Sequence, residues 1–295
     1  MHFRSITALI WTLGISLLPA ANPPALPDIS SIPKDLEIPL VEDGVPAPGK
    51  RVKQTTPGWE GTEVHHAIYL PRDWKPGGTY PVLAEYAGNG GFKNAFGDVS
   101  EGMVEGSHLG FGLSAGRNYI WVCLPFVKVQ GNNKTNATLW WGQPDETAAY
   151  CVATMRFLEK NYGADPKALV LCGFSRGSIA CNYIGLRNDE IAGLWRAFLC
   201  HSHYDGVKTH WPYSDCDRTS ALARLQRLKS RPQFISHEVS VQPTRDYLQT
   251  TGISGAFTFV DLTFRNHTDQ WALCDCDTRR QARAWLKSLG LPAAE

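Results

Sequence analysis

The chain has 295 residues, with 29 Lys and Arg against 28 Asp and Glu, so its formal net charge is +1. A chain this close to neutrality carries no electrostatic footprint for nucleic acid or for an acidic membrane surface. With 43% hydrophobic, 11% aromatic and 19% charged residues, it is too rich in core-forming side chains to be disordered or fibrous, and its length fits one large globular domain.

The first 21 residues have the layout of a secretory signal peptide. Their apolar run, ITALIWTLGISLL at 6–18, is too short to span a hydrocarbon core roughly 30 Å thick. Arg4 precedes this run, and the small residues Ala20 and Ala21 follow it. We therefore predict that residues 1–21 are removed on export, that the protein is secreted or periplasmic, and that it has no membrane span. The alternative is an N-terminal helix that docks on the domain.

A proline-rich leader follows at 22–49. It holds seven prolines and shows neither a helical nor a strand period. We expect an extended segment that lies on the surface or is mobile. The folded domain is expected at 50–295.

Apolar runs predict seven strands in this domain, at 62–70, 80–86, 119–125, 168–172, 194–200, 233–236 and 256–261. Helical patterns fall at 146–162, directly after Ser175, and at 220–228, 244–250 and 278–289. Continuously apolar strands that alternate with helices form parallel sheets covered on both faces. We therefore predict an α/β fold, a single domain with a doubly wound, mostly parallel sheet that starts with antiparallel strands.

Two connections are too long to be simple turns, at 87–118 and 204–218. Both follow the carboxyl ends of predicted strands, where open α/β sheets place their ligands. We expect both connections to border the functional site.

Ser175 is the strongest candidate for a catalytic residue. It lies in the sequence LVLCGFSRGSIA at 169–180, which is an apolar strand, then G-x-S-x-G, then a segment compatible with a helix. Gly173 and Gly177 permit the tight strand-to-helix turn because a Cβ there would clash. The helix N-terminus that follows stabilises negative charge. This context predicts a nucleophile elbow, and a glycine-rich turn without catalytic function is the alternative.

With this motif, the chain resembles the α/β-hydrolase superfamily, in the direction of secreted esterases and dienelactone-hydrolase-like serine hydrolases. The resemblance runs from about Lys50 to the C-terminus and rests on the Ser175 elbow, the glycine-rich loop after Tyr86 and the segment around His267. It implies that the nucleophile, an acid and a histidine follow one another along the chain.

That order implies His267 as the general base, since it lies after the last predicted strand and before the C-terminal helix. Glu238 is the first carboxylate after the strand at 233–236 and is the implied acid, which would fix the tautomer of His267. Asp205 is the alternative acid, because some members of the superfamily take it one strand earlier. Asp246 is a further candidate.

An acyl-transfer site also needs two N–H donors for the developing oxyanion. The resemblance implies the backbone N–H of Arg176 as one donor, and Asn89 or Gly90 in the glycine-rich loop as the other. An arginine after the nucleophile is similar to secreted glucuronoyl esterases, whose full motif is not matched. This similarity implies that the Arg176 guanidinium holds an oxyanion or an acidic group of the substrate.

The segment HSHYD at 201–205 offers a rival site, because its H-x-H-x-D spacing is typical of some metal-dependent hydrolases. Gly206 stands where those enzymes need another histidine. We therefore expect no metal, and expect this segment to form a polar wall beside Ser175.

Aromatic residues in the predicted loops are candidates for substrate binding, since their faces stack on sugars and other flat groups. Packing in the core is the alternative for each of them. These aromatic candidates are Trp140, Trp141, Trp211 and Trp271. His203 of the 201–205 segment is a separate candidate for contacting the substrate.

Eight cysteines in an exported chain permit disulfides. The better candidates for bridges lie in polar stretches, at Cys216, Cys274 and Cys276. Buried thiols are expected in the apolar runs, at Cys123, Cys172 and Cys200.

Together these features predict a secreted serine hydrolase that cleaves a carboxylic ester through an acyl-enzyme on Ser175, with His267 as base and Glu238 as acid. The expected substrate is a small-molecule or carbohydrate-linked ester, with no cofactor and no nucleic-acid partner. A serine peptidase on the same fold is the first alternative. A metal-dependent or noncatalytic α/β protein is the second.

Overall fold

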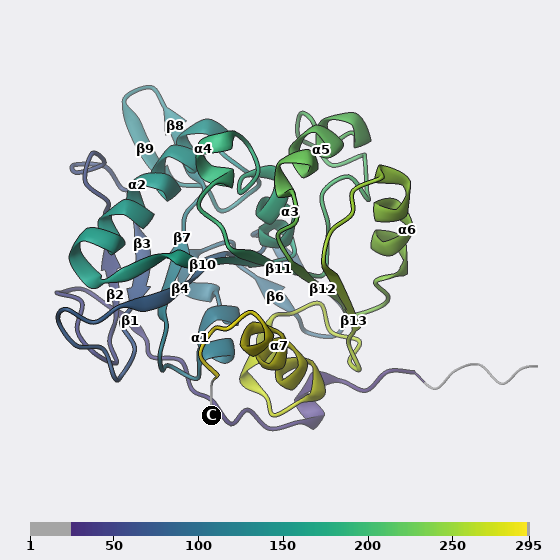
Figure 1. Ribbon diagram of the computed structural model, residues 1–295, viewed down its shortest axis with the longest axis horizontal. Coiled ribbons are helices and arrows are strands. Elements are labelled where there is room, and N and C mark those ends of the chain that lie inside the picture. Colours follow the sequence, from purple (N-terminus) through teal and green to yellow (C-terminus); the bar gives the residue numbers. More distant parts are fainter. Residues whose placement is uncertain (1–24, 294–295) are drawn as a thin grey trace, which may run out of the picture.

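A sheet of nine strands forms the centre of the molecule (Figure 1). The computed structural model describes residues 25–293, so the predicted export signal at 1–21 lies outside the described residues. In spatial order the strands are β1 (Val41–Glu42), β2 (Arg51–Gln54), β3 (His66–Tyr69), β7 (Ile120–Leu124), β4 (Tyr80–Tyr86), β10 (Ala164–Phe174), β11 (Ala197–His201), β12 (Gln233–His237) and β13 (Phe257–Asp261).

The six strands from β7 to β13 run parallel to one another, whereas β3 pairs antiparallel with both β2 and β7. The prediction of a mostly parallel sheet with an antiparallel start is therefore confirmed. Because parallel strands end at one edge, the loops after β4, β10, β11, β12 and β13 all emerge on the same side of the sheet.

Helices cover both faces of this sheet (Figure 1). One face packs against α2 (Pro144–Tyr162), α3 (Arg176–Tyr183), α4 (Asp189–Ala192), α5 (Arg218–Leu225) and α6 (Gln242–Thr251). The other packs against α1 (Leu109–Ser114) and α7 (Asp277–Ser288). Residues of β10 alternate between the two cores, since Leu169 and Leu171 lie in the first and Val170 and Cys172 in the second.

All seven predicted strands exist, but several short elements were not predicted from the sequence. These are β1, β2, the hairpins β5 (Phe92–Lys93) with β6 (Val99–Ser100) and β8 (Val127–Gln130) with β9 (Asn133–Asn136), and the helices α1 and α4. Helix α1 contains two glycines, which weaken any local helix signal. A Cβ on Gly110 would overlap the indole of Trp121, so this glycine allows α1 to pack closely on the sheet.

The part of the leader that the structure describes, 25–49, packs against the domain and crosses beneath α7 (Figure 1). The backbone N–H of Ile29 donates to Asn266 Oδ1 at 2.8 Å, and that of Asp35 donates to the carbonyl of Leu273 at 3.1 Å. Asp35 also accepts two hydrogen bonds of 2.6 Å from the guanidinium of Arg279 on α7. This segment is therefore an ordered strap rather than a mobile linker.

All eight cysteines are free thiols, including the predicted bridge candidates Cys216, Cys274 and Cys276. Cys123, Cys172 and Cys200 are buried, as expected. Between residues 25 and 293, no helix is both long and apolar enough to cross a bilayer.

Asp35→Ala tests how strongly the leader is anchored. The substitution leaves the guanidinium of Arg279, only 4% exposed, with Asp275 at 3.7 Å as its remaining carboxylate. We expect the free energy of unfolding to fall by about 2 kcal/mol, between the values for exposed and buried ion pairs. Denaturation by urea measures it. The control Glu42→Ala breaks an exposed pair with Lys50 and should cost less than about 0.5 kcal/mol, so equal losses would contradict the anchoring.

Candidate active site

Ser175 occupies a sharp turn between the end of β10 and the start of α3. Its backbone is strained, with φ 54° and ψ −112°, and its N–H donates to the carbonyl of His201 at 2.9 Å. A Cβ on Gly177 would overlap the carbonyl oxygen of Tyr86, and one on Gly173 would overlap the backbone of Gly177. Only glycine fits both positions, so the turn has the geometry of a nucleophile elbow.

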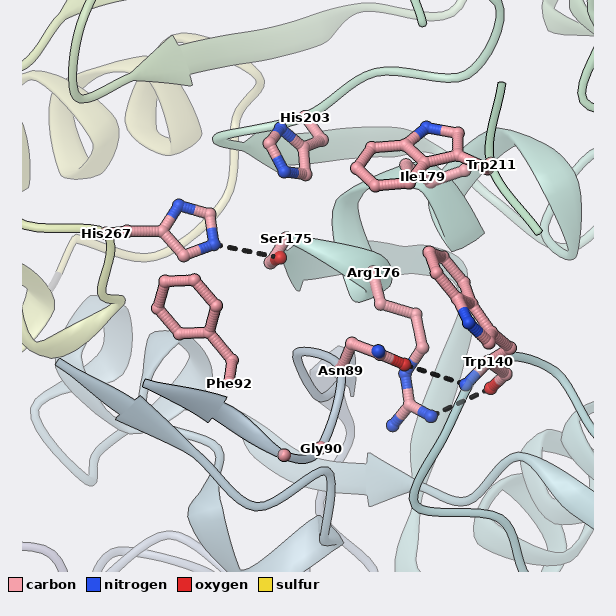
Figure 2. Close-up of a pocket in the computed structure, with 11 residues that line it drawn as sticks. Asn89, Gly90, Phe92, Trp140, Ser175, Arg176, Ile179, His203, Trp211 and His267 are labelled. Carbon is pink, nitrogen blue, oxygen red and sulfur yellow. Dashed lines mark hydrogen bonds between the residues drawn. The ribbon is translucent and has the colours of Figure 1, made fainter. Parts of the chain in front are cut away.

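The structure brings Ser175, His267 and Glu238 into one hydrogen-bonded chain, of which Figure 2 shows the bond between Ser175 and His267. His267 Nε2 lies 3.0 Å from Ser175 Oγ, and its Nδ1 lies 2.6 Å from Glu238 Oε1. Since a carboxylate can only accept, the proton is on Nδ1, which leaves the Nε2 lone pair free to accept the Ser175 hydroxyl proton. Burial alone would raise the pKa of Glu238, but the hydrogen bond from His267 and the neighbouring histidines hold it below its usual value.

Asp205, the alternative acid, does not reach His267. Its carboxylate accepts hydrogen bonds of 2.8 and 3.1 Å from the guanidinium of Arg224 on α5, in a pair that is almost fully buried. Arg224 also donates to the carbonyl of Asp215 at 2.8 Å. Asp205 therefore anchors the long loop after β11 to α5. Asp246, the further candidate, accepts from Gln242 within α6 and makes no hydrogen bond with His267.

The loop that carries His267 is fixed on both sides of the histidine. Asp98 accepts from the His267 N–H at 2.9 Å and from Asn266 Nδ2 at 2.8 Å. His201 lies 3.0 Å from the carbonyl of Thr268 through Nε2 and 3.0 Å from Ser236 Oγ through Nδ1. Sequence reasoning missed Asp98, because nothing local links the short β5–β6 hairpin to a loop far along the chain.

The histidines and the aspartate of the 201–205 segment point to different places. His201 is buried under the His267 loop, and burial lowers its pKa to about 4. His203 faces the pocket, where burial and the nearby His267 lower its pKa to about 3. Asp205 pairs with Arg224. The spacing that suggested a metal therefore does not form a ligand set, and no cluster of three potential ligands occurs in the range 25–293.

A cavity of about 460 Å³ opens beside Ser175 (Figure 2). Its apolar wall consists of Trp140, Trp211, Phe92 and Ile179. The rings of Trp140 and Trp211 lie 5.3 Å apart between centroids, with an angle of 56° between their planes. The two long connections supply Phe92 and Trp211, as the sequence predicted for the border of the site, whereas Trp140 lies between β9 and α2 and Ile179 lies in α3.

Two of the predicted substrate-binding tryptophans belong to the core instead. Trp141 is 3% exposed and stacks on Tyr183 with centroids 4.6 Å apart. Trp271 is fully buried beneath His201, with ring centroids 5.3 Å apart. Their loop positions in the sequence gave no sign of this burial, whereas Trp140 and His203 do line the pocket.

Of the three predicted oxyanion donors, the structure leaves two N–H groups available. The N–H of Gly90 donates to the carbonyl of Thr138 at 2.8 Å, so the expectation for Gly90 is wrong. Asn89 and Arg176 line the pocket, and neither backbone N–H has a hydrogen-bond partner among the described residues.

The Arg176 guanidinium, expected to hold an oxyanion or an acidic substrate group, turns away from Ser175 (Figure 2). It donates to backbone carbonyls of the surrounding loops, at 2.8 Å to Trp140, 3.1 Å to Gly102 and 3.3 Å to Ala137. It also lies over the ring of Phe126, 4.0 Å from the centroid. The side chain therefore holds the pocket loops together by hydrogen bonds to their backbone.

No family model and no curated protein matches this chain. Among solved structures, esterase 2 of Thermogutta terrifontis, phosphorylated by paraoxon, is similar over 84% of this chain and 97% of its own, with 14% identity and a TM-score of 0.55. An S-formylglutathione hydrolase from Agrobacterium tumefaciens is similar over 85% and 98%, with 12% identity and a TM-score of 0.55. A ferulic acid esterase is similar over 80% and 96%, with 13% identity and a TM-score of 0.51. These similarities show that the chain has the α/β-hydrolase fold.

Glu238→Gln and Asp205→Asn separate the two candidate acids. An amide at Glu238 presents the wrong hydrogen-bonding group to His267, so we expect the rate at which a fluorophosphonate labels Ser175 to fall about 10³-fold or more, with little change in stability. Asp205→Asn leaves Arg224 buried without its charge partner. We expect it to cost about 3 kcal/mol of stability and to change labelling only a few-fold.

Both variants are measured by labelling time courses and by thermal unfolding. A labelling rate that falls more in Asp205→Asn than in Glu238→Gln, for protein that is still folded, would assign the acid to Asp205.

Proposed function

We propose that this chain is a serine hydrolase that cleaves carboxylic esters through an acyl-enzyme on Ser175. The observation that carries this proposal is the hydrogen-bonded chain from Ser175 through His267 to Glu238, on an elbow that faces a cavity. A nucleophile, a base and an orienting acid within hydrogen-bond reach are the minimum set for acyl transfer. The esterase neighbours, which share the fold, support the assignment.

In this mechanism His267 Nε2 accepts the Ser175 proton while Oγ attacks the ester carbonyl. The resulting oxyanion is bound by the N–H groups of Arg176 and Asn89, and the imidazolium is stabilised by Glu238. His267 then gives its proton to the departing alcohol, and the acyl group stays on Ser175. A water molecule, deprotonated by His267, releases the acid and restores the serine. Each step uses only residues of this chain and water.

The cavity favours an uncharged ester that carries a flat ring. Trp140, Trp211 and Phe92 present aromatic surface, and none of the described residues that line the cavity carries a carboxylate. Arg176 also lines the cavity, but its guanidinium donates its hydrogen bonds to backbone carbonyls. Phenolic acyl groups and ring-shaped alcohols, including carbohydrate-linked esters, meet this description. The likeness to a ferulic acid esterase points the same way.

An ester substrate fits the cavity better than a peptide does. A peptidase that trims chains from one end needs a charged group for the peptide terminus, and for the amino terminus this is a carboxylate. Among the described residues, Glu238 and Asp205 do not line the cavity, and both are buried and paired, with His267 and Arg224 respectively.

Export of the enzyme is part of the proposal and rests on the sequence alone. The apolar run at 6–18, with Arg4 before it and alanines after it, supports a secreted or periplasmic enzyme. An ester attached to an extracellular carbohydrate or aromatic compound is then accessible to it.

A fluorophosphonate probe and p-nitrophenyl esters test the proposal together. We expect one adduct, on Ser175, by peptide mass spectrometry, and hydrolysis that falls at least about 10³-fold in Ser175→Ala. A chelator should leave hydrolysis unchanged. Hydrolysis that persists in Ser175→Ala, or that disappears when the chelator is added, would contradict the serine mechanism.

Trp140→Leu tests the preference for a ring, since leucine keeps the apolar surface and removes the aromatic face. We expect kcat/KM for a feruloyl or benzoyl ester to fall about 5- to 10-fold, and for an acetyl ester of the same alcohol less than about twofold. The matched control is Trp74→Leu, a half-buried tryptophan that packs on Tyr162. Equal losses on both esters would refute aromatic recognition at Trp140.

A further inference from the structure

Ser202 lies against both partners of the His267–Glu238 hydrogen bond. It directly follows β11 and is only 2% exposed. Its Oγ is 3.1 Å from Glu238 Oε1 and 3.0 Å from His267 Nδ1. The sequence held no sign of this, because Ser202 lies between two histidines whose spacing suggested a metal site instead.

The chemistry of the partners fixes the direction of these hydrogen bonds. Glu238 can only accept, so the Ser202 hydroxyl donates its proton to Oε1. Nδ1 of His267 donates to the same oxygen, and a lone pair of Ser202 Oγ faces this N–H. The side chains of Ser202, His267 and Glu238 are therefore each within hydrogen-bond distance of the other two.

The Glu238 carboxylate has few other partners. Its Oε2 is buried without a hydrogen bond. His237 Nδ1 is 3.6 Å from Oε2 and accepts from the N–H of Val239, so it has no proton for Glu238. Among the described residues, Ser202 and His267 are thus the two side chains that hold this carboxylate by hydrogen bonds.

The backbone at Ser202 adopts a conformation that suits glycine. Its φ is +86°, and its N–H donates to the carbonyl of Ser236 at 2.7 Å, which holds it there. A side chain with a Cβ is disfavoured in this region. A glycine would satisfy the same backbone with less strain, and only the hydroxyl would be lost.

We propose that Ser202 is a positioning residue of the Ser175–His267–Glu238 site, which holds the Glu238 carboxylate and the His267 ring in their catalytic orientation. The inference rests on the proposed hydrolase function. Ser202 neither gives nor takes a proton during turnover. It restrains Oε1 at the place where the imidazolium forms, so its removal acts on the chemical step and not on substrate binding.

Ser202→Ala and Ser202→Gly test this together. Both remove the hydroxyl, but only glycine relieves the backbone. We expect kcat for a p-nitrophenyl ester to fall about tenfold in both variants, equivalent to about 1.4 kcal/mol, with KM within twofold of the wild type. The unfolding temperature of Ser202→Gly should exceed that of Ser202→Ala.

Two variants far from the site provide matched controls. Ser114→Ala removes a buried hydroxyl that bonds to neighbouring backbone in α1 and in the turn that follows it. Lys229→Gly relieves an exposed residue with φ +55°. Neither should change kcat. If both Ser202 variants keep the wild-type kcat, or if glycine restores what alanine loses, the proposal is overturned, because the effect is then absent or due to the backbone.

A spectroscopic readout keeps this test apart from that of the proposed function. The Nδ1–H proton of His267 gives a downfield NMR signal when it bonds to a carboxylate, and we expect the Ser202→Gly substitution to shift it. An unchanged signal overturns the proposal for Ser202. Wild-type protein that neither reacts with a fluorophosphonate nor hydrolyses esters contradicts the hydrolase function instead, and the NMR shift still decides the role of Ser202.

Discussion

The hydrogen bond between His267 Nδ1 and Glu238 Oε1 joins the loop after β13 to the end of β12, and much of the surrounding structure supports it. A carboxylate this deeply buried keeps its charge only if donors replace the lost water. His267 and Ser202 are those donors, and the neighbouring histidines help to lower the pKa of Glu238. The parallel pairing of β10, β11 and β12 brings Ser175, Ser202 and Glu238 to one edge of the sheet. The fold thus holds the Glu238 carboxylate in a fixed position against His267.

His267 comes from a loop rather than a strand end, so it needs restraints of a different kind. Asp98 of the β5–β6 hairpin accepts from its backbone, and His201 contacts the carbonyl that follows it. The leader reaches the preceding residue, where Ile29 donates to Asn266. Three segments that are far apart in the sequence therefore converge on one loop. This convergence explains why the strap at 25–49 is ordered although its own composition is typical of a linker.

The parts of the molecule that could be predicted are those with a local signal. The apolar strands and the elbow at Ser175 depend on patterns within a few residues, and the order along the chain implied His267 and Glu238, which the structure brings together. The features that could not be predicted from the sequence depend on tertiary contacts. Asn89 or Gly90 was expected to supply the second oxyanion donor, and the N–H of Gly90 instead donates to the carbonyl of Thr138. Trp141 and Trp271 look like loop residues until the packing of Tyr183 and His201 buries them.

Arg176 shows how structure and chemistry are combined in one residue. Arg176 begins α3 and lines the pocket, while its guanidinium donates to the carbonyls of Trp140, Gly102 and Ala137. Burial lowers its pKa to about 9, which still leaves it charged at neutral pH, and no carboxylate pairs with it among the described residues. The positive charge of Arg176 is held by the carbonyl dipoles of the pocket loops rather than by a carboxylate of the described residues. A lysine could carry the charge but lacks the fork that joins three carbonyls, so the loops that shape the pocket require arginine.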